Sequence, residues 1–436
     1  MNKKIFQFLL WAYMSLAVFV NQAYADDFVR WFCDSTLRLD YVLGGGPEGP
    51  AIFLAGQTKQ EGWAGRKNNL KQTPVMGNGN ILVTDPLTKD TLYNNCFSTL
   101  FQEWIYTPEA QTSSLSFENS FLVPLPLQDA DITLTLRDNR HNEIARLTHR
   151  YKKDDVLIRE ANSHTLPYIY LHQGNVDNGK AIDLAILAEG YTQDEMDSFI
   201  EKARQISNEI LSYKPFCDNK DKFNIIAVKS PSEESGVSIP RFKIWKDARY
   251  GSHFSTFYSD RYLTSPKVWK MHEDLEGIPY EQILVIVNTP EYGGGGIFNS
   301  YQIASADHHF TLPVSVHEFG HSFAGLADEY DYGDEEDSLY DNDIEPWEPN
   351  ITTLVDFSSK WRDLINPDTP IPTPFISKPE INKDKTLELG VYEGGGYKKT
   401  GVYRPTVTCR MRDNYYPVFC PVCIDALQKT IDFYTD

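Results

Sequence analysis

The residues most able to do chemistry form the run His317-Glu318-Phe319-Gly320-His321. On a helix, residues four apart lie on one face, one turn apart, so both imidazoles can reach a single metal ion. The glutamate between them is then placed to take a proton from a water molecule on that metal. We therefore predict a hydrolytic zinc site on a helix, with Glu318 as its general base.

A catalytic zinc site uses three protein ligands and keeps one position for water, so a third ligand must follow the two histidines. Gly325 can end the helix, and Asp328 lies three residues beyond it. We predict Asp328 as the third ligand, because its short offset from the glycine lets the chain turn back to the metal. Glu329 is its rival, and Asp331 is a weaker candidate.

A methionine lies farther along, in the segment 409–413, which contains Met411 among turn-forming residues. Methionine packs well in cores, which is the simpler interpretation. The alternative is a methionine turn lying beneath the metal. A tyrosine hydroxyl could also stabilise the oxyanion of a tetrahedral intermediate. The candidates for that role are Tyr301, Tyr330, Tyr415 and Tyr416.

The chain has 436 residues and a formal net charge of −20, which disfavours nucleic acid as a partner because phosphates require Lys and Arg. Part of the acidity is local: nine of the sixteen residues from Asp328 to Asp343 are Asp or Glu. A solvated acidic loop explains this run. A Ca²⁺ site is the alternative, although the spacing does not match an EF-hand.

The first 25 residues have the pattern of a signal peptide. Lys3 and Lys4 precede a largely apolar stretch, Ile5–Val20, and Ala23-Tyr24-Ala25 fits a cleavage site. No other apolar run is long enough to span a bilayer, so we expect no transmembrane anchor after cleavage. The expected location is outside the cytoplasm: periplasmic, at the cell surface or secreted.

Export would permit disulfides. The cysteines are Cys33, Cys96, Cys217, Cys409, Cys420 and Cys423. Cys33 and Cys96 could pair in the first half, and the others among themselves, although sequence does not give connectivity. The lone Cys420-Pro-Val-Cys423 could be redox-active or half of a zinc knuckle. No second ligand pair lies near it in sequence, so structural disulfides are the preferred interpretation.

The first half of the chain, 26–155, has the pattern of short strands separated by turn residues. Ile132, Leu134 and Leu136 alternate with polar residues, which predicts a half-buried strand, and residues 144–148 predict its partner. We expect an all-β sandwich here. The polar run 152–155 marks the expected boundary.

The second half, 156–436, changes character. The strand predicted at 182–187 runs into Thr192, which can cap a helix with Glu195 in a capping box. Further strands are predicted at 223–228 and 283–287, giving an α/β layout with a mixed sheet. The glycines at 293–296 are either a flexible turn or an edge to which a substrate backbone could add.

Several motifs of this half resemble the bacterial IgA-type metallopeptidases. They are HEFGHSFAGLADEY, the strand end Ala188–Thr192, Cys409-x-Met411 and Phe419-Cys420-x-x-Cys423, and the resemblance spans Ile182 to Leu427. The wider metzincin pattern is also similar, although Gly325 comes one residue late and the third ligand is acidic. The resemblance implies a metzincin-like zincin fold behind a β-rich domain. It also implies His317 and His321 as zinc ligands and Glu318 as base.

The leading hypothesis is an exported zinc endopeptidase acting on proteins or peptides, with host or mucosal glycoproteins among the candidate substrates. The mention of IgA in the name of the resembled family does not identify the substrate of this chain. An exopeptidase is a second possibility, and a third is an inactive zincin fused to a β-sandwich that binds protein or glycan, as in an adhesin. The long segment 331–406 is expected to form loops over the cleft or a simple surface insertion.

Overall fold

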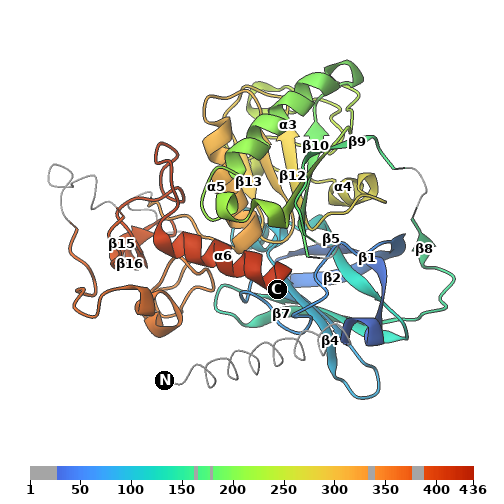
Figure 1. The fold of residues 1–436 in the computed structure, drawn as a ribbon, viewed down its shortest axis with the longest axis horizontal. Coiled ribbons are helices and arrows are strands. Elements are labelled where there is room, and N and C mark those ends of the chain that lie inside the picture. The colour runs from blue at the N-terminus through green and yellow to red at the C-terminus, as the bar shows by residue number, and fades with distance from the viewer. Residues whose placement is uncertain (1–26, 162–164, 177–179, 332–338, 376–386) are drawn as a thin grey trace, which may run out of the picture.

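The computed structural model describes residues 27–161, 165–176, 180–331, 339–375 and 387–436 (Figure 1). The predicted signal peptide, residues 1–25, lies outside these ranges. Among the described helices, none is both long and apolar enough to cross a membrane.

The first half folds into two four-stranded sheets that share one hydrophobic core. The first sheet has the order β5-β1-β2-β8, with β1 at Phe32–Gly46, β2 at Gly49–Glu61, β5 at Leu115–Pro126 and β8 at Arg159–Glu160. The second has the order β4-β3-β6-β7, with β3 at Gly79–Thr84, β4 at Thr91–Phe97, β6 at Ala130–Arg137 and β7 at Glu143–Tyr151. Because β8 pairs with β2, the first sheet includes residues beyond 155.

The strand expected around Ile132 is β6, and it pairs antiparallel with β7 as the alternation predicts. Strand β6 differs from the predicted half-buried strand, because the side chains on both of its faces are buried. Ile132 and Leu134 are fully buried in the core, and Thr133 on the other face is also buried, with its hydroxyl 2.9 Å from that of Thr148. The reason is position: β6 lies between β3 and β7 in the middle of its sheet.

The second half contains a six-stranded mixed sheet of order β13-β14-β12-β10-β11-β9, in agreement with the predicted mixed sheet. The four inner strands are parallel, and the edge strands β9 and β13 run antiparallel to their neighbours. The strands are β9 at Tyr168–His172, β10 at Ile182–Glu189, β11 at Phe223–Val228, β12 at Gln282–Val287, β13 at Gly294–Gly296 and β14 at Gln302–Ser305.

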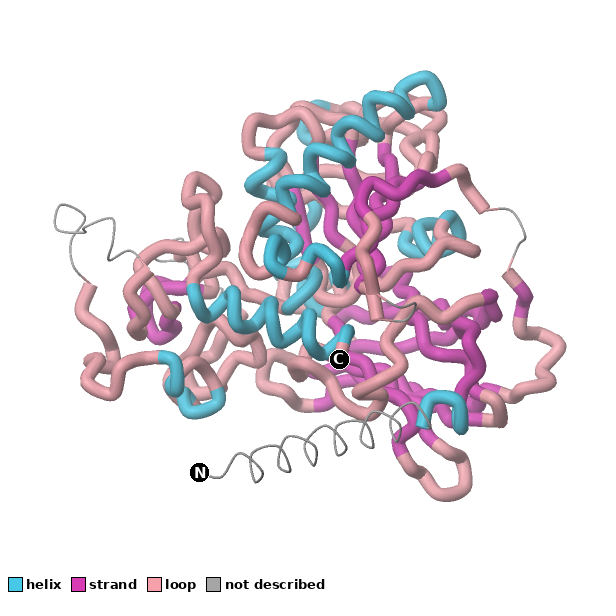
Figure 2. The backbone as a smooth tube through the Cα atoms, in the orientation of Figure 1, coloured by secondary structure: helices cyan, strands magenta, loops and turns pink. Residues whose placement is uncertain are grey.

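Helices cover both faces of this sheet (Figure 2). One face packs against α3 (Met196–Ile210), α5 (Thr311–Ala324) and α6 (Pro421–Thr435). The other packs against α4 (Val268–Asp274) and the loops around it. The capping box predicted before α3 is present, because Thr192 and Glu195 make both of its hydrogen bonds.

The remaining elements are short. The first half also contains α2 (Leu100–Trp104), and the segment between α5 and α6 contains the hairpin of β15 (Tyr392–Gly395) and β16 (Lys398–Arg404). The 3₁₀ turns are Pro108–Gln111, Gln193–Glu195, Phe216–Asp218, Lys220–Lys222, Pro240–Phe242, Thr256–Tyr258, Phe357–Ser359 and Arg362–Leu364. Helix α6 reaches the first half at its end, where Asn69 donates to the Phe433 carbonyl over 3.1 Å.

Candidate metal centre

The helix α5 carries the HExxH motif and ends at the expected glycine. Phe319 and Phe323 are buried in the core, on a different side of the helix from His317 and His321. Gly325 has φ of 62°, a left-handed conformation that glycine adopts without strain, and its N–H donates to the His321 carbonyl over 2.9 Å. The chain therefore turns back toward the histidines directly after the helix.

The two histidines and Asp328 converge on one point. Asp328 Oδ1 lies 3.0 Å from His317 Nε2 and 3.3 Å from His321 Nε2, and the two Nε2 atoms are 3.0 Å apart. Tetrahedral ligands about 2.0–2.1 Å from zinc would be separated by about 3.3 Å. The three donor atoms are thus spaced to share one small cation.

Each of these three side chains makes a second hydrogen bond, through an atom other than the one at the shared point. His317 Nδ1 lies 3.0 Å from the Arg410 carbonyl and His321 Nδ1 lies 2.5 Å from the Leu326 carbonyl. A carbonyl only accepts, so both rings carry their proton on Nδ1 and leave Nε2 free to bind a metal. Tyr397 donates its hydroxyl to Asp328 Oδ2. This is the outer support that metal ligands commonly have, and the residues fit a zinc ion.

Electrostatics at the trio also favour a cation. Burial opposes protonation of His321, but the neighbouring Asp328 carboxylate outweighs it and raises the pKa of His321 to about 9. Burial raises the pKa of Glu318, while the two imidazoles draw it back down. A carboxyl group with a raised pKa is a better proton acceptor than an exposed glutamate.

The rivals of Asp328 lie elsewhere. Glu329 points away from the histidines toward Cys420 and Cys423. Asp331 Oδ2 lies 3.3 Å from the Arg412 guanidinium. Of the three acidic candidates, Asp328 is the one whose carboxylate meets both imidazoles.

Met411 lies against α5. A side-chain carbon on Gly320 would be 2.8 Å from the Met411 sulfur, so a larger residue there would push the Met411 side chain aside. The neighbouring Arg410 carbonyl is the one that faces His317. The 409–411 segment therefore lies alongside α5 at the histidines, as a methionine turn would.

The four tyrosine candidates occupy different places. Tyr330 stacks beside His317, with ring centroids 6.5 Å apart and an interplanar angle of 17°. Tyr415 lines the same cleft but is 78 % exposed. Tyr301 is buried away from the cleft with its hydroxyl donating to Ser265, and Tyr416 is not among the cleft-lining residues.

His317 and His321 line a cleft of about 970 Å³. Both halves of the chain line it: Glu103 of α2 faces Tyr262, whose hydroxyl donates to it. Burial raises the pKa of Glu103 to about 7, although that hydrogen bond opposes the shift. Tyr340 and Trp347 contribute from the 331–406 segment, which thus reaches the cleft as one of its two interpretations expected.

Three of the glycines at 293–296 form the edge strand β13 (Gly294–Gly296), which packs on α5. A side-chain carbon at Gly296 would be 2.5 Å from the Glu318 carbonyl, and one at Gly294 would be 2.8 Å from Glu318 Oε1. Gly294 also forms a bridge with Tyr262, so at that residue the edge is already paired within the chain.

Two other expectations concern ions and disulfides. Asp341 and Asp343 of the acidic run pair with Arg140, while residues 332–338 lie outside the described ranges, so the Ca²⁺ hypothesis stays a prediction.

All six cysteines are free thiols, so the expected disulfides are absent. Cys33 lies in β1 and Cys96 in β4, which belong to different sheets, and the Cys33 thiol donates to the Leu125 carbonyl.

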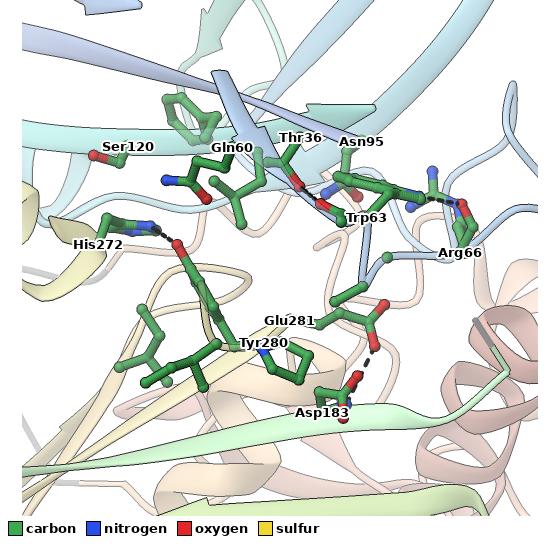
Figure 3. A pocket seen from close by; sticks show the side chains of 18 of the residues that line it. Thr36, Gln60, Trp63, Arg66, Asn95, Ser120, Asp183, His272, Tyr280 and Glu281 are labelled. Atoms are coloured by element: carbon green, nitrogen blue, oxygen red, sulfur yellow. Dashed lines mark hydrogen bonds between the residues drawn. The ribbon is translucent and has the colours of Figure 1, made fainter. Parts of the chain in front are cut away.

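A second cavity, of about 410 Å³, lies between the two halves (Figure 3). Its walls include Arg66 of the first half and His272 and Tyr280 of the second, the latter two joined by a 2.7 Å hydrogen bond. Asp183 and Glu281 approach each other at its floor.

The structure thus combines a β domain with an α/β domain, and residues of both line a cleft that contains a group able to hold a metal ion. The model of the IgA Peptidase M64 family matches residues 171–388, and the model of the Peptidase M64 N-terminus matches residues 27–148. The chain belongs to this peptidase family. A comparison with curated proteins gave no match.

Two supporting residues escaped the sequence analysis. Tyr397 holds Asp328, and the buried Asn350 amide bonds both the N–H and the carbonyl of Ala327, at 2.7 and 2.9 Å. The only sequence signal for Tyr397 is its place directly after the glycines of 394–396, and Asn350 had none.

Proposed function

We propose that this chain is an exported zinc-dependent endopeptidase with a metzincin-like zincin catalytic domain. The observation that carries the proposal is the convergence of His317, His321 and Asp328 beside Glu318 in a large open cleft. Membership of a peptidase family supports the reaction class. The signal-peptide pattern of the first 25 residues supports export.

In this proposal His317, His321 and Asp328 hold the zinc ion, which when bound lowers the pKa of water and polarises the scissile carbonyl. Glu318 takes the proton of the attacking water and passes it to the leaving amine. Its carboxylate lies against Gly294, on the strand that borders the cleft, and so faces the space where substrate must pass.

A protein or peptide lying through the cleft is the proposed substrate. Residues of both halves line the cleft, among them Tyr330 beside His317 and Glu103 of α2, and its volume is about 970 Å³. This favours internal cleavage over trimming from a chain end.

The test pairs metal analysis with substrate profiling on the mature protein. Wild type should bind zinc and cleave members of a peptide library at internal bonds. Glu318→Ala should keep its zinc and its melting temperature while kcat/KM falls about a hundred- to ten-thousand-fold. Glu201→Ala, an exposed glutamate on α3, is the matched control and should cleave as wild type does.

The competing hypothesis is an inactive zincin that serves a binding module. It predicts that wild type holds zinc yet cleaves no peptide, and that Glu318→Ala changes nothing measurable. That pair of results would overturn the endopeptidase proposal.

A further inference from the structure

A second group of metal-type ligands lies behind the cleft. It consists of Glu329, Cys409, Cys420 and Cys423, and all four side chains are fully buried. Glu329 belongs to the segment after α5, and Cys420 and Cys423 lie at the start of α6. Cys409 belongs to the segment 409–413 around Met411, called the methionine loop below. The match to the family's catalytic model ends at residue 388, so it includes none of the three cysteines.

The spacing of the donor atoms is that of a tetrahedral site. The four ligand atoms lie within 4.8 Å of one another. Cys409 Sγ lies 3.8 Å from Cys423 Sγ, and Glu329 Oε1 lies 3.2 Å from Cys423 Sγ and 3.9 Å from Cys420 Sγ. Zinc with bonds of about 2.3 Å to sulfur and about 2.0 Å to oxygen would separate its ligands by about 3.8 and 3.5 Å.

The glutamate itself indicates a missing partner. Its Oε1 accepts a 3.0 Å hydrogen bond from Asn350, but its Oε2 has no hydrogen-bond partner among the described residues although it is buried. Burying a carboxylate oxygen without compensation is costly, and such groups are normally paired or bound to a metal. The nearby guanidinium of Arg404 donates to the carbonyls of Glu393 and Gly394.

The thiols are poorly explained by a disulfide. Three cysteines cannot pair completely, and the 3.8 Å between Cys409 and Cys423 sulfurs far exceeds a disulfide bond of about 2.05 Å. Cys420 is the N-cap of α6, and its N–H points at the Cys409 sulfur over 3.1 Å. A helix N-terminus and an N–H donor both stabilise thiolates, which is the form that binds metal.

We propose that Glu329, Cys409, Cys420 and Cys423 bind a structural zinc ion. Thiolate-rich tetrahedral sets select zinc, and four protein ligands close the coordination sphere, as in a structural site. In the sequence the Cys-x-x-Cys stands without further ligands nearby, and the fold supplies them from Cys409 and the distant Glu329.

The second zinc ion would stabilise the geometry of the proposed catalytic zinc site. Glu329 directly follows Asp328, so one peptide unit joins the two sites. The Glu329 N–H also donates to the Met411 carbonyl over 2.8 Å, which ties it to the loop whose Arg410 carbonyl orients His317. The structural ion would thereby fix both the third ligand and the methionine loop.

The deciding sample is the full mature chain carrying His317→Ala and His321→Ala, purified under reducing conditions. Wild type should hold two zinc ions per chain and this double variant one. With Co²⁺ in place of zinc, the double variant should show thiolate-to-cobalt charge-transfer absorption in the near ultraviolet. Peptide mapping of wild type should find no disulfide among the three cysteines.

Two single variants refine the assignment. Glu329→Gln and Cys423→Ser should each lose one zinc relative to wild type, whereas Cys217→Ser, a thiol outside the cluster, should lose none. A double histidine variant that binds no metal, or binds Co²⁺ without thiolate absorption, would overturn the proposal. So would a Cys409–Cys423 disulfide in wild type. Because metal content is read directly, these outcomes do not depend on peptidase activity.

Discussion

Tyr397 shows how a single hydroxyl supports the proposed metal-binding trio of His317, His321 and Asp328. Its donation to Asp328 Oδ2 leaves Oδ1 directed at the two imidazoles. We expect Tyr397→Phe to weaken zinc binding about ten-fold or more, since outer partners of metal ligands are worth that much. Competition with a chromogenic chelator measures the affinity.

The control is Tyr392→Phe, on the same hairpin, whose hydroxyl donates over 3.4 Å to the Glu388 carbonyl rather than to the trio. It should bind zinc as wild type does. Equal zinc affinity in both variants and wild type would show that the Tyr397 hydrogen bond does not position Asp328.

The convergence of the residues of the proposed metal site was predictable because they are close in sequence. His317, Glu318 and His321 follow helix periodicity, and Gly325 and Asp328 follow His321 by four and seven residues. The residues that support them were not predictable, because Arg410 lies 93 positions from His317 and Tyr397 lies 69 positions from Asp328, and nothing local marks either. Glu329 was judged as a rival ligand of the same metal, since sequence does not tell on which side of the chain a side chain points.

At the scale of elements, the strands and helices of the second half follow their local patterns, and the capping box before α3 is an example. What sequence did not show is how strands become neighbours. Asp183 at the start of β10 and Glu281 just before β12 lie side by side because those strands pair in parallel, although they are far apart in the chain.

The burial of these two carboxyl groups makes stability depend on pH. Burial raises the pKa of Asp183 to about 6, against a weaker opposing hydrogen bond from Asn224, and also raises the pKa of Glu281. A raised folded-state pKa means that the folded protein holds the proton more tightly than the unfolded chain does. The stabilisation is complete below about pH 4 and is lost as the pH rises through about 6.

Asp183→Asn should therefore be more stable than wild type near pH 7.5, by up to about 3 kcal/mol, while keeping the Asn224 contact through its amide oxygen. The advantage should vanish below about pH 4. Melting temperatures of both proteins across this pH range test it, with exposed Glu48→Gln as control. An advantage that does not change with pH would contradict this account.

At the scale of the whole molecule, ion pairs between described residues join the halves, some of them buried and some exposed. Buried Arg38 of β1 lies 3.1 Å from Glu276, which follows α4, and Arg38 also pairs with Asp40. Arg140, in the loop after β6, pairs with Asp341 and Asp343 at the surface. Sequence composition gave no hint of which charges would meet across this interface.

The buried and the exposed pairs should contribute very different amounts to the free energy of unfolding. Glu276→Gln leaves the buried Arg38 guanidinium with only Asp40 to offset its charge and also removes the carboxylate that pairs with Arg159, and we expect a loss of about 3 kcal/mol in unfolding free energy. Arg140→Gln should change stability little, because exposed pairs are screened by water and salt. Calorimetry at low and high salt separates them: the Glu276→Gln loss should persist in high salt. Equal shifts in the two variants would mean that burial of the Arg38 pair does not hold the halves together.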